Sequence, residues 1–346
     1  MAVAIRTITR IQDADDAPTL GAGQNGYALT WDDATGKFVA SQISGTGGRI
    51  LLTGVQVLRD AQASSSYTGT LIVGNGGQSL SRSSGTQTYY NTLVGIDAGL
   101  NCTTAENNTV LGSQAFLTNT TGNSNVAVGM KTLYSNTTGG INTAIGREAL
   151  YFNTTGTSNS AFGYAVLYKN TSGGFNMAIG RQAMYENLTG THNAAIGYQS
   201  LYYNTSGAYN LAIGTSAFLA NTTGSNNVAL GWEAGRYHAN GSTALQTAAN
   251  SIYIGTQCRG KDNSDNNSIV IGYQAIGQGA NTTVIGNTST VLTAFPGGAL
   301  QITEMTAPSA PAANNATIYA EDDGGGKTRL MVRFATGAAQ QIAIEP

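Results

Sequence analysis

The middle of the chain repeats one pattern of apolar and polar positions every 17 residues. Nine glycines stand at this spacing, from Gly95 to Gly231, and an asparagine precedes each of them by four residues. Of the three residues in between, the last is always large and apolar, and the middle one is alanine from Ala127 to Ala229. A short segment of this kind closed by glycine predicts a strand that ends at a sharp corner.

A second apolar cluster follows each glycine, as at 149–151 and 183–185, and it leads into an Asn-Thr-Thr-Gly motif. Asparagine at the first and glycine at the fourth position are typical of a type I turn. The apolar cluster is too short for a helix, which favours a strand or a single turn. We therefore expect each repeat to form one coil of a solenoid, with two short strands and two turns.

Successive coils are expected to pair as parallel strands about 4.8 Å apart. Stacking in register then places identical side chains above one another, in ladders of asparagine and of tyrosine. The sequence thus predicts an all-β chain built around a parallel β-roll or solenoid of 17-residue coils.

The flanking regions follow other patterns. An insertion at 237–247 lengthens one spacing to 24 residues, and the next glycines follow after 17 and then 14. Alternating residues predict strands at 27–31 and 37–43, around Val3 and Ile5, and at 300–304, 317–320, 328–334 and 340–344. We expect an N-terminal β module, a Ser/Gly-rich transition, the solenoid, irregular coils and a C-terminal β module, at 1–50, 51–90, 91–240, 241–298 and 299–346.

One coil is too thin to bury its own apolar residues. Each repeat offers only about three bulky apolar side chains, and a flat two-layer roll cannot bury both faces of both strands, whereas solenoids need a continuous core. Lateral association of three parallel rolls, side by side or intertwined, satisfies this need with closed cyclic symmetry. The alternative is a monomeric β-helix.

Composition argues against several classes of function. Charged residues make up 10% of the chain and the net charge is -2, so neither nucleic acid nor an anionic membrane is an expected partner. No apolar run is long enough to span a membrane, so membrane insertion is not expected. No signal peptide is visible, so we expect the chain to be made in the cytoplasm. Two distant cysteines, Cys102 and Cys258, exclude a disulfide scaffold and are interpreted as plain thiols.

Catalysis and cofactors also find little support. His192 and His238 are isolated, which predicts surface residues and no metal site. The five acidic residues of 91–238 do not recur at equivalent places in adjacent coils, whereas a glycan-cleaving enzyme needs paired carboxylates. We expect no enzyme activity, no cofactor and no metal. The Asn-Thr-Thr motifs also match glycosylation acceptors, but turn geometry already explains them.

Three sets of residues are candidate ligand contacts. The first is a tyrosine stripe at one repeat position, which is suited to stacking on sugar rings or, alternatively, to packing between subunits. The second varies freely just after the glycine and is expected to face solvent, with or without a ligand. The third alternates along a C-terminal strand and suits an acidic glycan, a solvated face or salt bridges between subunits. These sets are Tyr134, Tyr151, Tyr168, Tyr185 and Tyr202; Tyr164, Tyr198 and Trp232; and Arg329 and Arg333.

The repeat pattern of 91–240 resembles the stalks of bacteriophage tail fibre proteins, which in turn resemble the left-handed β-roll heads of trimeric autotransporter adhesins. The motif Asn-Ser-Ile-Val-Ile-Gly at 267–272 is closer to the adhesin form. Residues 26–39 are similar to segments near the N-termini of phage fibres, and 327–334 with 340–345 look like a tip module of such proteins. The missing secretion signal and membrane anchor argue against an autotransporter, and the self-cleaving chaperone domain of many related fibres is not seen.

This resemblance implies a homotrimeric, adhesin-like virion protein of a phage tail. Its N-terminal region would bind other tail or baseplate proteins, the solenoid would act as a stiff spacer, and the far end would attach to a glycan or protein of the host surface. Several trimers per particle would bind tightly by avidity. The alternatives are a structural appendage or capsid decoration without a receptor role, a glycan-depolymerising tailspike and, last, an ice binder.

Overall fold

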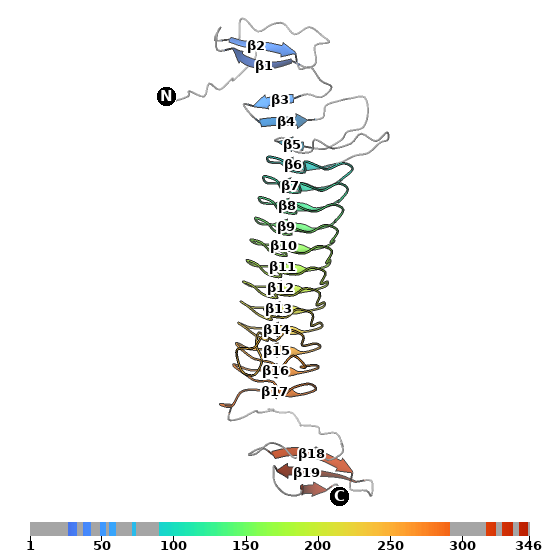
Figure 1. The fold of residues 1–346 in the computed structure, drawn as a ribbon, viewed down its shortest axis with the longest axis vertical. Coiled ribbons are helices and arrows are strands. Elements are labelled where there is room, and N and C mark those ends of the chain that lie inside the picture. Colours follow the sequence, from blue (N-terminus) through green and yellow to red (C-terminus); the bar gives the residue numbers. More distant parts are fainter. Residues whose placement is uncertain are drawn as a thin grey trace, which may run out of the picture. The chain divides into compact units, whose positions relative to one another are not determined.

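The computed structural model describes residues 90–290 continuously, together with 27–32, 37–42, 49–52, 55–59, 71–73, 316–322, 327–334 and 339–344. These residues form twenty strands and no helix, which confirms the all-β class (Figure 1). No helix that could cross a membrane is found among them. The strands expected around Val3 and Ile5 and at 300–304 lie outside the described residues.

A parallel β-solenoid dominates the structure, as the 17-residue period predicts. Each of its coils contributes one three-residue strand to a single sheet, in which neighbours pair in parallel and in register from β5 to β17. These strands are β5 (Leu71–Val73), β6 (Thr92–Val94), β7 (Thr109–Leu111), β8 (Val126–Val128), β9 (Thr143–Ile145), β10 (Ser160–Phe162), β11 (Met177–Ile179), β12 (Ala194–Ile196), β13 (Leu211–Ile213), β14 (Val228–Leu230), β15 (Ile252–Ile254), β16 (Ile269–Ile271) and β17 (Thr283–Ile285).

The second strand expected in each coil is not present, and this prediction was wrong. The apolar cluster after the glycine is a series of tight turns in which alternate residues, such as Glu148 (φ 59°) and Leu150 (φ 52°), take the left-handed conformation. An extended strand cannot contain such residues. The segment nevertheless pairs with its neighbour, because the Leu150 N–H donates to the Val166 carbonyl (2.9 Å) and the Phe152 N–H to the Tyr168 carbonyl (3.0 Å). We call this segment the turn layer.

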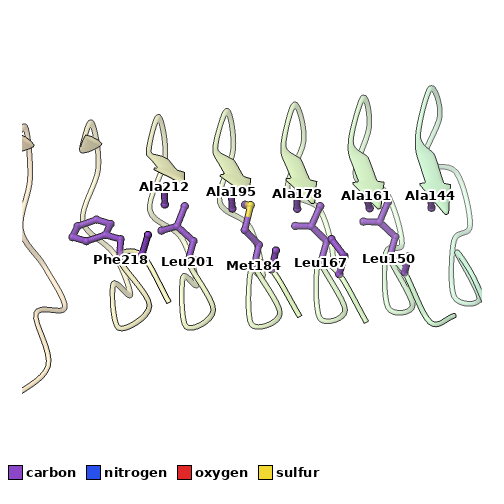
Figure 2. Close-up of a cluster of buried hydrophobic side chains, with 14 of the residues drawn as sticks. Ala144, Leu150, Ala161, Leu167, Ala178, Met184, Ala195, Leu201, Ala212 and Phe218 are labelled. Atoms are coloured by element: carbon purple, nitrogen blue, oxygen red, sulfur yellow. The ribbon is translucent and has the colours of Figure 1, made fainter. Parts of the chain in front are cut away.

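The apolar core between the strand and the turn layer is thin. The central strand residue points inward, and it meets a leucine, methionine or phenylalanine from the turn layer (Figure 2). Ala144, Ala161 and Ala178 lie on the strand side, and Leu150 and Leu167 lie opposite, all fully buried. Because the two layers are close, alanine is the side chain that fits on the strand side without forcing them apart.

Two asparagine ladders complete the interior and confirm the predicted stacking. In the first, the Asn159 side-chain oxygen accepts from both the backbone N–H (3.1 Å) and the side-chain amide (3.1 Å) of Asn176. In the second, the Asn170 amide donates to the Asn153 side-chain oxygen (2.7 Å) and to the Gly173 carbonyl (3.0 Å). These asparagines are buried, so they satisfy backbone groups that the short strands leave free.

The glycines allow the coils to approach closely. Gly180 ends its strand at φ +123°, and a Cβ placed there would stand 2.6 Å from the Gly197 carbonyl oxygen. Both the backbone conformation and the space require glycine at this corner.

The insertion at 237–247 leaves the sheet intact. β14 and β15 pair in register across the 24-residue coil, and the extra residues close on themselves through an antiparallel bridge between Tyr237 and Ala244. Before the parallel strands, β3 (Arg49–Leu52) and β4 (Val55–Arg59) join the same sheet in antiparallel pairs.

Two small antiparallel sheets lie outside the solenoid sheet. The first is the hairpin of β1 (Tyr27–Asp32) and β2 (Lys37–Gln42). The second belongs to a separate unit of residues 290–346 and consists of β18 (Ala316–Asp322), β19 (Thr328–Phe334) and β20 (Gln340–Ile344). The strands at 27–32 and 37–42 and these last three lie where the alternating residues predict them.

Candidate functional site

The outer side of the solenoid sheet carries a continuous row of apolar side chains. We call the first and third residues of strands β6 to β17 the strand face; none of these residues is charged, and none is fully buried. The third residue of each strand is large and apolar, as in Ile145, Ile179 and Ile213. The Ile145 side chain, for example, is 40% exposed. The large side chain before each glycine therefore points away from the coil's own core. A continuous row of exposed apolar side chains is typical of interaction surfaces.

Two residues before the strand, another outward position carries a short aromatic stack. The rings of Phe175, His192 and Tyr209, on three consecutive coils, stack with centroids 4.9 Å and 4.8 Å apart. All three side chains are exposed. His192 is thus a stacked surface residue next to the strand face, as its isolation in the sequence predicts.

The predicted tyrosine ladder lies on the turn layer. Tyr134, Tyr151, Tyr168, Tyr185 and Tyr202 stack ring on ring with centroids 4.8 Å to 5.1 Å apart. Partial burial raises the pKa of Tyr151 and Tyr202. The neighbouring phenols, Tyr134 for Tyr151 and Tyr185 for Tyr202, contribute a smaller increase in pKa. Since each inner ring covers the faces of its neighbours, the ladder presents edges to solvent and offers no free face between Tyr134 and Tyr202 for a sugar ring.

Two further aromatic side chains cover these edges. Phe152 and Tyr203 occupy the sixth position after the corner glycine, three coils apart, and they are 42% and 49% exposed. Phe152 packs at 71° to Tyr151 (4.7 Å) and at 87° to Tyr168 (5.3 Å). Tyr203 packs at 71° to Tyr202 (4.7 Å), the same geometry. Neither residue stands out in the sequence, because this position varies between coils and only the neighbouring tyrosines repeat.

On the two coils between Phe152 and Tyr203, the same position carries the two residues of an ion pair, Lys169 and Glu186. The Lys169 ammonium donates to a Glu186 carboxylate oxygen at 2.8 Å, and this hydrogen bond raises the pKa of Lys169. The ammonium also lies 5.9 Å from the centroid of the Tyr185 ring. We call Phe152, Lys169, Glu186 and Tyr203 the aromatic–ionic stripe.

Just after the glycine corner, arginine and tyrosine alternate along the solenoid. Tyr164 lies 5.7 Å from the guanidinium carbons of both Arg147 and Arg181, and Arg181 also approaches Tyr198 at 5.9 Å. Tyr164, Tyr198 and Trp232 are exposed. The structure places these residues in one row, while the tyrosine ladder follows a different row of the coil.

The two C-terminal arginines belong to the separate unit. Arg329 pairs with Glu321 across β18 and β19, with 3.1 Å between the guanidinium and carboxylate atoms. Arg333 is half-buried and stands opposite Thr317 in the same pair of strands. Arg329 thus forms a salt bridge within its own chain.

The described residues contain no group of three His, Cys, Asp or Glu side chains that could hold a metal ion. The His238 N–H donates to the Thr243 carbonyl within the insertion. Burial raises the pKa of the Cys102 and Cys258 thiols to about 11, so both stay protonated. The Asn-Thr-Thr asparagines, such as Asn136 and Asn153, are fully buried, so they are closed to glycosylation once the coil has formed.

Comparison with known proteins gave no match to a family model, a curated protein or a solved structure. Any assignment of function therefore rests on the residues and their geometry.

Proposed function

We propose that this chain is a homotrimeric fibre of a phage virion that joins the tail to the host surface. The observation that supports this proposal is the strand face, an uncharged surface whose apolar third-residue row continues through twelve consecutive strands, β6 to β17. Single exposed apolar residues are common on proteins, but a contiguous stripe of this length is a feature of interfaces.

An assembly of three copies would cover this surface. A flat strand face on each chain covers the other two when three solenoids pack around one axis, and closed symmetry leaves no apolar face exposed. Each interdigitating isoleucine or leucine row then supplies the burial that the thin alanine core lacks, at about 25 cal/mol per Å² of apolar surface.

The same arrangement gives the fibre its role. Three inward strand faces leave the three turn layers outward, where the tyrosine ladder and its neighbours can meet a host glycan or protein. The N-terminal region would bind the tail or baseplate, and several fibres per particle would turn weak contacts into firm attachment. A purely structural appendage shares the same assembly but binds no host surface.

The mass of the purified chain in solution tests the assembly. We expect a mass near three times 35.5 kDa. A double substitution on the strand face, Ile179→Asp with Ile213→Asp, should reduce the mass to one chain, because buried carboxylates without partners are costly. Thr189→Asp, at an exposed position of the Asn-Leu-Thr-Gly turn that follows the turn layer, is the control and should leave the trimer intact. A wild-type monomer would exclude the trimer.

Binding to whole bacterial cells tests the receptor role. The labelled trimer should bind the surface of a susceptible strain in a saturable way and compete with virion adsorption. A stable trimer that binds no cell that the virion infects would favour the structural appendage.

A further inference from the structure

The aromatic–ionic stripe combines features that the rest of the turn layer lacks. Its four residues occupy the same position on four consecutive coils, in the order aromatic, cation, anion, aromatic. With about 4.8 Å between coils, Phe152 and Tyr203 are about 14 Å apart along the axis.

Both outer rings are partly open to solvent, with Phe152 42% and Tyr203 49% exposed. Tyr151 is stacked on one side by Tyr134 (4.8 Å) and on the other by Tyr168 (5.1 Å), so Phe152 can meet only its edge. The Phe152 ring is therefore steeply inclined to both Tyr151 and Tyr168, at 71° and 87°. Tyr203 makes one such contact, at 71° to Tyr202, which is the last ring of the ladder.

The polar groups between the rings are balanced. Lys169 offers N–H donors and Glu186 offers carboxylate acceptors, and their opposite charges cancel. Three residues further along the same four coils are exposed side chains whose hydroxyl groups have no hydrogen-bond partner among the described residues: Thr155, Ser172, Thr189 and Ser206. A ligand of this surface therefore needs apolar faces, many hydroxyl groups and no net charge.

We propose that the aromatic–ionic stripe binds an unbranched, uncharged oligosaccharide that runs along the solenoid axis. The apolar faces of two sugar units stack on Phe152 and Tyr203, and the hydroxyl groups of the units between them bond to Lys169 and Glu186. The separation of the two rings requires a chain longer than a disaccharide. This inference deepens the proposed function, since it names the ligand class and its place on the outward turn layer.

Saturation-transfer NMR with cellohexaose and chitohexaose as probes tests the site. The wild-type protein should transfer saturation to at least one hexasaccharide, and more weakly to the disaccharide of the same sugar. The double variant Phe152→Ala with Tyr203→Ala should raise the Kd by up to about tenfold for each lost ring. The control Tyr273→Ala removes a tyrosine that is 61% exposed but lies in a different row of a later coil, and it should bind like the wild type.

Lys169→Gln with Glu186→Gln separates the polar contribution. This variant should weaken binding while both rings remain, and circular dichroism and the solution mass should match those of the wild type. The site is overturned if the wild type transfers saturation to neither hexasaccharide, or if the double aromatic variant binds as well as the wild type.

The outcomes also separate this inference from the proposed function. A trimer that binds cells but neither hexasaccharide refutes the stripe alone. A chain that binds a hexasaccharide through the stripe but binds no cell that the virion infects keeps the site and removes the receptor role.

Discussion

Replacing Asn170 with alanine tests how much the asparagine ladders stabilise the solenoid. The wild-type amide donates to the Asn153 side-chain oxygen (2.7 Å) and the Gly173 carbonyl (3.0 Å), and its own oxygen accepts from Asn187 (2.8 Å). In the variant, the Gly173 carbonyl still accepts a hydrogen bond from the Asn159 amide, and the Asn187 amide still donates one to the Gly190 carbonyl. The Asn153 side-chain oxygen is left without a donor. Three lost bonds at about 1 kcal/mol each, with one orphaned buried acceptor, predict a loss of about 3–5 kcal/mol.

Asn221 is the natural comparison, because the ladder ends there. Its amide makes two bonds, to Asn204 (2.9 Å) and Gly224 (3.0 Å), and its oxygen has no partner. Asn221→Ala should therefore cost about 1–2 kcal/mol less than Asn170→Ala. Thr189→Ala removes an exposed hydroxyl and should stay within about 0.5 kcal/mol of the wild type.

Urea unfolding followed by circular dichroism measures these differences, at one protein concentration because assembly contributes to stability. Equal losses at Asn170 and Asn221, or a loss below about 1 kcal/mol at Asn170, would refute the view that buried amide bonds hold successive coils together.

Three further predictions concern single positions. Gly180→Ala should cost at least about 1–3 kcal/mol in urea unfolding from backbone strain alone, and an unchanged midpoint would contradict the proposed close approach of the coils. Burial raises the pKa of Asp265 above 3.8, so the contribution of this carboxyl to stability is complete below that value and is lost as pH rises through the folded-state pKa. The stability of Asp265→Asn relative to the wild type should therefore increase from pH 4 to pH 8. A constant difference between the two proteins would refute this. With pKa values of about 11, the buried thiols of Cys102 and Cys258 should react slowly with a disulfide reagent at pH 8 until urea is added, and fast native reaction would show that they are accessible.

The period of the sequence predicts most of the solenoid, because stacking in register makes each repeat a copy of its neighbour. The parallel pairing of β6 to β14 and both asparagine ladders follow from the 17-residue spacing of Asn and Gly. The turn layer could not be predicted in the same way. Residues such as Glu148 and Leu150 adopt the left-handed conformation although nothing in their chemistry favours it, since the inter-coil hydrogen bonds hold them there.

The candidate site shows a different limit. Strand positions alternate, so the inward Asn159 and Ala161 place Ser160 and Phe162 outward, and the sequence contains that information. Hydrophobicity alone suggests the opposite, with the large residue inside. Phe152 and Tyr203 differ again: the 17-residue period places them in one line, but each is a single aromatic residue at a variable position, and only the fold shows that both pack against the tyrosine ladder.

The uniform pairing edge of the coils also determines how the length of this protein can change. Each coil from β8 to β13 presents the same backbone donors and acceptors to the coil before and the coil after it. Removing or copying one 17-residue unit therefore recreates the same junction and alters the axial length by about 4.8 Å. Recombination between such units in the gene can lengthen or shorten the rod in equal steps, without a new core or a new turn having to arise.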